Sequence, residues 1–245
     1  MRRHRKNRDI PLQAAELLDD ITASIIWGIL VILMVFTLWM LTDLSNFNSH
    51  GAQAAAGHDL KELNRINPDT AAWLEMKNTH IDYPVVKGKD NFEYLDLDIN
   101  RNFYVGGTLF IDAANRKDLS DEYIIIHGHH MSDGIMFGDL DKYLDDKFMR
   151  VSRKGTLKTL EDSYDLEVFA AGTADAYDSG IYNMEADLDT HLNAIDDLKI
   201  RSYGIKETVD KVLVLSTCTD RMDDTRTVVF CSMKRSEVPP EVENG

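Results

Sequence analysis

A cysteine and an arginine lie close together near the C-terminal end of the chain. Two short apolar runs rich in β-branched residues occupy segment 211–231, one leading into Cys218 and one following Arg226. Runs of this kind, joined by a short polar loop, predict an antiparallel hairpin with the thiol and the guanidinium side by side at one end of a sheet. A cysteine attacks as its thiolate, which a nearby cation favours, and an arginine can also stabilise an oxyanion. The segment therefore predicts a nucleophilic site that still lacks a group to move protons.

Three histidines follow another buried apolar run, residues 123–126. A histidine at a strand end beside the cysteine would supply the missing proton carrier. Two alternatives stay open: His127 and His129 share a face of the strand and could form a zinc pair, or the histidines could simply cap the strand. No HExxH or CxxC pattern accompanies them in the sequence. We therefore expect no metal.

The charge of the chain is strongly negative and unevenly distributed. The net charge of the 245 residues is −15, and the part after residue 42 holds 22 basic and 38 acidic residues. Phosphate contacts need clustered Lys and Arg, so we expect no nucleic-acid partner. The two cysteines, Cys218 and Cys231, cannot form a disulfide framework. In the predicted hairpin Cys231 lies roughly 16 Å along the strand from Arg226 at about 3.3 Å per residue, beyond disulfide reach, so both thiols are expected to be free.

Residues 21–41 contain no charged side chain. At 1.5 Å per residue they span about 31 Å, which matches a bilayer core of about 30 Å. The basic cluster before them predicts a cytoplasmic N-terminus and an exported remainder. A cleaved signal peptide is the alternative, although its apolar core is usually shorter. The predicted organisation is a cytoplasmic segment 1–20, a membrane anchor 21–41, a linker 42–57, a folded domain 58–235 and a flexible tail 236–245.

Most remaining elements are predicted to be short strands bounded by turns. Strands are expected at residues 73–76, 81–86, 108–111, 156–160 and 164–171. Helices are expected at 59–66, 136–143 and 185–198, with one helical turn at 90–95. The sequence shows no internal repeat and no Gly-rich phosphate loop. The pattern predicts a mostly β barrel or sandwich with a few helices.

Taken together, these segments resemble the sortases, membrane-anchored cysteine transpeptidases of Gram-positive bacteria, and within them class B. LSTC at 215–218 matches the signature around the nucleophile, with Arg226 at the expected distance, and IIIHGHHM at 124–131 is similar to the segment around the catalytic histidine. NTHIDYPVVKGKDNFEYL at 78–95, MFGDL at 136–140 and the helix at 185–198 are also typical of class B. The resemblance covers roughly residues 58–233 plus the anchor. One departure is His127, where the family often has tyrosine.

The resemblance implies a fold and a set of site residues. The fold is a mostly β, eight-stranded barrel with several short helices, one longer helix before the cysteine strand, and an N-terminal transmembrane helix. Cys218 would be the nucleophile, His129 the general acid/base and Arg226 the stabiliser of oxyanion and substrate. Four positions match residues of the substrate groove: Asn91, Leu95, Ser216 and Thr219. His127, at the position where the family often has tyrosine, is a fifth candidate for substrate binding.

The resemblance also implies a reaction and its partners. Cys218 would cleave a C-terminal sorting motif, similar to NPQTN or NPKTG, after its threonine, and the thioacyl-enzyme would pass to an amine of the lipid-linked peptidoglycan precursor. Partners would be the membrane and surface proteins that carry the sorting signal, with no cofactor. A pilin lysine as acceptor is one alternative. A non-catalytic anchored surface domain is a second, and a papain-like hydrolase, whose cysteine precedes its histidine, is a third.

Overall fold

The computed structural model describes residues 20–40, 59–131, 134–197, 201–202, 209–218 and 224–237. The chain divides into two compact units, residues 1–52 and 53–245. Within the described part, the first unit contains one helix, Asp20–Met40, which is long and apolar enough to cross a membrane. Its mean hydropathy reaches 2.5. The predicted apolar helix is thus confirmed as a candidate span, one residue earlier at its start than expected.

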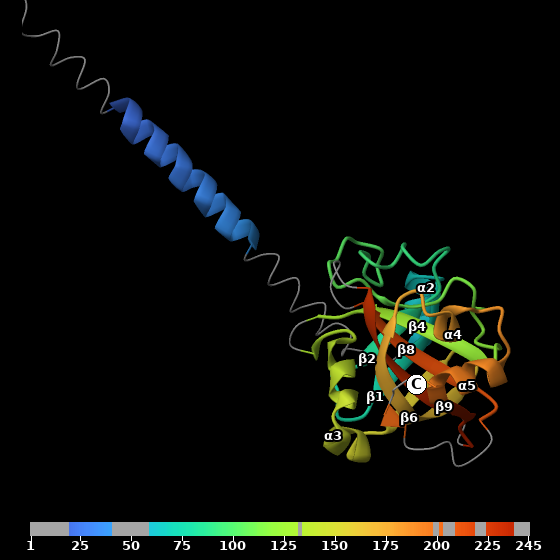
Figure 1. Ribbon diagram of the computed structural model, residues 1–245. Coiled ribbons are helices and arrows are strands. Elements are labelled where there is room, and N and C mark those ends of the chain that lie inside the picture. Colours follow the sequence, from blue (N-terminus) through green and yellow to red (C-terminus); the bar gives the residue numbers. More distant parts are fainter. Residues whose placement is uncertain are drawn as a thin grey trace, which may run out of the picture. The chain divides into compact units, whose positions relative to one another are not determined.

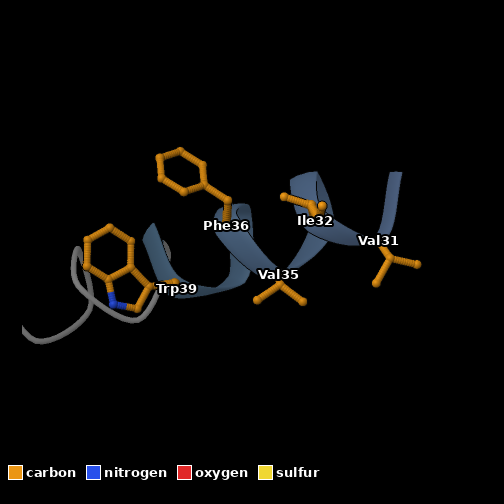
Figure 2. A pocket seen from close by; sticks show the side chains of 5 residues that line it. All are labelled: Val31, Ile32, Val35, Phe36 and Trp39. Atoms are coloured by element: carbon orange, nitrogen blue, oxygen red, sulfur yellow. The ribbon is translucent and has the colours of Figure 1, made fainter. Parts of the chain in front are cut away.

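The surface of this helix is apolar all around. Five side chains line a shallow hollow on one side, as Figure 2 shows: Val31, Ile32, Val35, Phe36 and Trp39. The rings of Phe36 and Trp39 lie 5.9 Å apart, centroid to centroid. A helix that exposes such side chains on every face suits a lipid environment better than water. The hollow holds no group that could do chemistry.

The second unit contains a closed barrel of eight strands (Figure 1). Its strands are β1 (Thr70–Met76), β2 (Asp82–Val86), β3 (Leu109–Ile111), β4 (Tyr123–His129), β5 (Lys154–Thr159), β6 (Ser163–Asp175), β8 (Val212–Cys218) and β9 (Thr225–Arg235). They pair in the order β5-β1-β2-β3-β4-β8-β9-β6, and the barrel closes because β5 also pairs with β6. The two-residue strand β7 (Arg201–Ser202) adds to β6 outside this closure. The eight-stranded barrel implied by the resemblance is therefore confirmed.

The described part of the second unit also contains several short helices. They are α2 (Leu60–Ile66), the 3₁₀ helix η2 (Gly138–Leu144), α3 (Asp146–Val151), α4 (Ser179–Tyr182) and α5 (Leu188–Asp197). Asp59 caps α2 by accepting hydrogen bonds from the first backbone N–H groups, which explains where that helix begins. The helix expected at 185–198 begins only at Leu188. The helical turn expected at 90–95 is wrong as a helix: it is a turn in which the Asp90 carboxylate binds the N–H groups of Phe92 and Glu93.

Strands β4 and β8 are buried on both faces along most of their length. Ile124 and Ile126 of β4 point into the main core inside the barrel, together with Leu213 and Leu215 of β8. The alternate residues form a second core on the outer face, beneath α4 and α5: Tyr123, Ile125, Val212 and Val214. Figure 1 shows these two helices together on one side of the barrel. Burial on both faces explains the continuous apolar runs of these strands, since a half-exposed strand would alternate.

Gly128 separates the two histidines at the end of β4. A Cβ atom at this position would lie 2.4 Å from Leu109 Cδ2 and 2.8 Å from Phe137 Cδ2. Only glycine fits there, because its hydrogen faces the packed interior of the barrel. His127 and His129 continue the outer face instead, beyond Ile125, where the helices no longer cover the strand completely.

Candidate active site

The pairing of β4 with β8 brings the predicted histidine and cysteine together. The two strands are parallel, and their register matches His127 with Ser216, Gly128 with Thr217 and His129 with Cys218. Paired positions on neighbouring strands lie about 4.8 Å apart. Positions 129 and 218 therefore lie side by side at the same end of the barrel, although 88 residues separate them in the chain.

Arg226 comes from the strand on the other side of β8. Strands β8 and β9 are antiparallel, and their last described pair is Ser216 with Val228. Continuing this register by two residues brings position 226 opposite position 218, which agrees with the predicted hairpin. Arg226 is half-buried and pairs with Ala174 of β6 on its other side. Thr219, a predicted groove residue, lies outside the described residues.

The ring of His129 is held by the backbone of the segment that follows β2. Its Nε2 atom lies 2.8 Å from the carbonyl oxygen of Leu95. A carbonyl oxygen only accepts hydrogen bonds, so Nε2 carries the proton and Nδ1 is the basic nitrogen of this tautomer. Leu95, predicted to contact substrate, thus contributes its carbonyl to orient a histidine, a role that its side-chain type does not reveal.

His127 belongs to a different network, which Asp112 organises. The Asp112 carboxylate accepts a hydrogen bond from His127 Nε2 at 2.8 Å and another from Asn91 Nδ2 at 2.8 Å. Asn91 in turn accepts one from the N–H of Ala113 at 2.7 Å. Burial raises the pKa of Asp112, but the donors, first among them His127 and then the Ala114 N–H, outweigh it, so the pKa is lowered overall. The carboxylate is therefore ionised at neutral pH.

Tyr182 of α4 covers the other side of His127. The two rings stack at a centroid distance of 6.5 Å with 18° between their planes. The hydroxyl of Tyr182 lies 2.8 Å from Oγ of Ser216, which is only 1% exposed. Burial raises the pKa of Tyr182, although the Ser216 hydrogen bond and the charge of Arg226 act in the opposite direction. Ser216, predicted in the groove, is therefore buried behind a tyrosine.

Sequence reasoning missed two members of this site, Asp112 and Tyr182. Asp112 follows directly after the buried strand β3, and an acid at a strand end was the available signal. Tyr182 ends a four-residue helix with no periodic pattern, so nothing in its surroundings marked it.

The structure holds the two histidines considered for a zinc pair, His127 and His129, in separate hydrogen-bond networks. The Nε2 atoms of the two rings bind different acceptors, the Asp112 carboxylate and the Leu95 carbonyl. In the part of the chain that the structure describes, no three His, Cys, Asp or Glu side chains converge as a metal site requires. The candidate site thus consists of His129 beside position 218, Arg226 on the next strand, and the polar network of Asp112 and His127 along the same face.

The closed barrel is the fold of a known class of protein. A sortase domain matches residues 74–234, and the chain belongs to the sortase family. Its relatives are class B sortases. Sortase B of Listeria monocytogenes is 32% identical over 169 residues, which cover 67% of this chain and 69% of that protein.

Solved structures agree in fold. A Streptococcus pyogenes class B sortase involved in pilus biogenesis superimposes with a TM-score of 0.67 at 31% identity, covering 73% of this chain and 99% of that one. A Staphylococcus aureus sortase B–substrate complex gives 0.65 at 25% identity, covering 79% and 95%. The family supports a transpeptidase role of the sortase kind for this chain.

Proposed function

We propose that this protein is a cysteine transpeptidase that cleaves a C-terminal sorting motif, similar to NPQTN or NPKTG, after its threonine. The observation that carries the proposal is the Cα pairing of His129 with Cys218 on adjacent parallel strands. Membership of the sortase family supports the same chemistry. The proposal assigns Cys218 as nucleophile, His129 as general acid/base and Arg226 as oxyanion stabiliser.

The first half of the reaction makes a thioester. The sulfur of Cys218 attacks the threonine carbonyl carbon, and the C–S bond forms as negative charge develops on the carbonyl oxygen. Arg226 offers a fixed positive fork of donors to that oxygen. As the C–N bond breaks, the protonated imidazole of His129 gives its proton to the leaving amine. The backbone carbonyl of Leu95 supports this step because it fixes the tautomer and the ring orientation.

The second half transfers the acyl group. An amine attacks the thioester, His129 takes the proton that the amine loses, and Cys218 leaves as the new amide forms. The acceptor proposed first is the amine of a lipid-linked peptidoglycan precursor. The Asp20–Met40 helix would anchor the enzyme at the membrane, with the basic N-terminus in the cytoplasm and the barrel outside. Tethering enzyme and acceptor to one surface raises their effective concentration.

The substrate groove is proposed to follow the outer face beyond Ile125. The rings of His127 and Tyr182 and the Leu95 segment border this face. His127 is held by its hydrogen bond to Asp112, which also accepts one from Asn91. Thr219 and Ser216 complete the matched positions, the latter through its bond to Tyr182.

A second candidate is pilin polymerisation, in which a lysine side chain replaces the cell-wall amine. The likeness to a class B sortase involved in pilus biogenesis favours it. Both candidates use the same catalytic residues and differ only in the acceptor.

One experiment tests the proposal and separates these candidates. The full chain in detergent is incubated with a panel of sorting-motif peptides, alone and with either a peptidoglycan-type peptide amine or a lysine-containing pilin peptide. Mass spectrometry is expected to show cleavage after threonine and a new amide to one acceptor. Absence of cleavage across the panel, in a chain that melts cooperatively, would contradict the proposal.

A further inference from the structure

Asp141, on the 3₁₀ helix η2, connects two strands that flank the cysteine strand. Its Oδ2 lies 2.8 Å from Nε2 of His130, and its Oδ1 accepts a hydrogen bond from Thr227 Oγ1 at 2.7 Å. His130 directly follows His129 at the end of β4, and Thr227 directly follows Arg226 near the start of β9. One carboxylate is therefore bonded to the neighbour of each proposed partner of Cys218.

The chain reaches this position by folding back on β4. The N–H of Phe137 donates to the carbonyl of His129 at 3.0 Å, and His130 forms a β-bridge with Met136. Gly138 is needed at the return, because a Cβ there would lie 2.1 Å from the carbonyl oxygen of Met131. Helix η2 then packs against β6, β8 and β9.

The two hydrogen bonds of Asp141 lie on the inner side of the barrel strands, opposite the proposed catalytic groups. Successive residues of a strand project to opposite faces. Thr227 is 2% exposed, and its neighbours Val229 and Cys231 on the same face belong to the interior core. Position 226 continues the outer face with Val228 and Phe230. Asp141 thus binds the inner side of the strands whose outer side carries His129 and Arg226.

The chemistry of His130, Asp141 and Thr227 fixes which group donates each hydrogen bond of this bridge. A carboxylate only accepts, so His130 Nε2–H and the Thr227 hydroxyl both donate to it. Hydrogen bonds to an ionised acceptor are stronger and shorter than neutral ones. The His130 and Asp141 side chains are 32% and 47% exposed, so the bridge is closed to solvent only at its Thr227 end.

We propose that Asp141 is a positioning residue, which clamps the ends of β4 and β9 so that His129 and Arg226 keep a fixed spacing on either side of Cys218. This inference rests on the proposed function, because it assumes that these three residues carry the reaction. Asp141 acts through its hydrogen bonds to His130 and Thr227, the chain neighbours of His129 and Arg226. It sets the geometry on which the rate depends, since small misplacements of reacting groups are costly.

The same helix supplies a matched control. Asp139 lies two residues before Asp141 and is 3% exposed. Its carboxylate accepts hydrogen bonds from the backbone N–H and Nδ1 of His80 and from Lys142 Nζ, at 2.8–2.9 Å. It fastens the turn between β1 and β2, which carries none of the proposed catalytic residues. Asp139 is therefore expected to matter for stability and Asp141 for rate.

The test uses the full chain in detergent and steady-state cleavage of a sorting-motif peptide. Asp141→Asn and Thr227→Val are expected to lower kcat about tenfold with little change in KM, because the groove is untouched. Thr227→Ser, which keeps the hydroxyl, is expected to restore kcat. Asp139→Asn is expected to lower the melting temperature more than Asp141→Asn does and to keep kcat.

The outcomes separate this inference from the proposed function. Unchanged kcat in Asp141→Asn and Thr227→Val, alongside an inactive Cys218→Ala, would overturn the clamp and leave the function standing. An equal loss of kcat in Asp139→Asn would reduce Asp141 to general structural support. If either isosteric variant fails to fold, His130→Ala cuts the partly exposed end of the bridge and must show the same selective loss of kcat. Peptide cleavage by the Cys218→Ala variant would instead contradict the proposed function itself.

Discussion

The outer face of the β4–β8 strand pair has two halves that differ in cover and in polarity. In the covered half, Tyr123 and Ile125 lie beneath α4 and α5 and are at most 6% exposed. In the open half, His127 and His129 are partly exposed, and each has its Nε2 atom bound to an oxygen. The same two strands thus pack against helices α4 and α5 at one end and carry partly exposed polar side chains at the other.

The two halves also differ in how they treat their histidines. In the covered half, His191 of α5 stacks on Tyr123 with ring centroids 3.7 Å apart. Its Nδ1 binds the carbonyl of Gly180, whereas its Nε2 and the Tyr123 hydroxyl are buried without a hydrogen-bond partner among the described residues. The open half leaves neither of its histidines in that state. The comparison indicates that packing governs the covered half and hydrogen-bond geometry the open one.

The largest expected effect comes from the end of the open half. Cys218→Ala is expected to abolish peptide cleavage and to leave the melting temperature close to that of the unsubstituted chain, because a single heavy atom is lost. Cys231→Ala is the matched control, since Cys231 is a free, buried thiol on the interior face. It is expected to keep activity at some cost in stability. Full activity in Cys218→Ala would erase the functional difference between the two halves.

The next prediction distinguishes the two histidines of the open half. His129→Ala is expected to be inactive, because proton transfer to the leaving amine is lost. Neither added zinc nor a chelator is expected to change the activity of the variant or of the unsubstituted chain. Inactivation of the unsubstituted chain by a chelator would favour a metal role for these histidines.

Arg226 is expected to matter through its shape as well as its charge. One fixed donor to an oxyanion contributes about 3–4 kcal/mol, or about 100-fold to 1,000-fold in rate. Arginine offers a planar fork, whereas lysine offers a mobile point charge. Arg226→Lys is therefore expected to lower transpeptidation about 100-fold while alkylation of Cys218 stays near normal. Near-normal turnover would show that a positive charge alone suffices.

A smaller effect is expected at the Asp112 network. His127→Ala removes a ring that packs on Tyr182 and a hydrogen bond to Asp112. The expected result is a KM for peptide about fivefold higher, from a loss of about 1 kcal/mol, with kcat largely kept. Steady-state kinetics separates the two constants. A loss confined to kcat would move His127 from substrate binding to catalysis.

The covered half is expected to affect activity least. Ile125→Ala removes a fully buried side chain beneath the helices and is expected to cost about 2–5 kcal/mol of unfolding free energy. Measured well below its melting temperature, the variant is expected to keep kcat. A large loss of kcat in a folded Ile125→Ala chain would show that the helices transmit their packing to the open half.

Local sequence patterns predicted where the individual strands lie better than they predicted which strands pair. The apolar runs before Cys218 and after Arg226 predicted the β8–β9 hairpin, because a short loop leaves adjacent strands little choice of partner. The pairing of β4 with β8 joins strands that are separated by 82 intervening residues, 130 to 211. No local pattern encodes that contact, and the resemblance to a known family implied only a barrel with the three catalytic residues.

The polar network was harder to predict than the strands. Asn91 and His127 were selected one by one, whereas the carboxylate that joins them, Asp112, comes from a third segment. The carbonyl of Leu95 acts through the backbone, so its residue type carries no signal. The resemblance assigned Ser216 to the substrate groove, but its side chain is buried and lies against the hydroxyl of Tyr182.

The burial of Cys231 has a practical consequence for measurement. The sequence contains two thiols, and burial raises the pKa of the Cys231 thiol, which keeps it protonated and shielded from reagents. An alkylating reagent applied to the native protein is therefore expected to take up one equivalent per chain and to report position 218. Active-site titration then becomes possible on the unsubstituted protein, with the second equivalent appearing only on denaturation as an internal standard for total chain concentration.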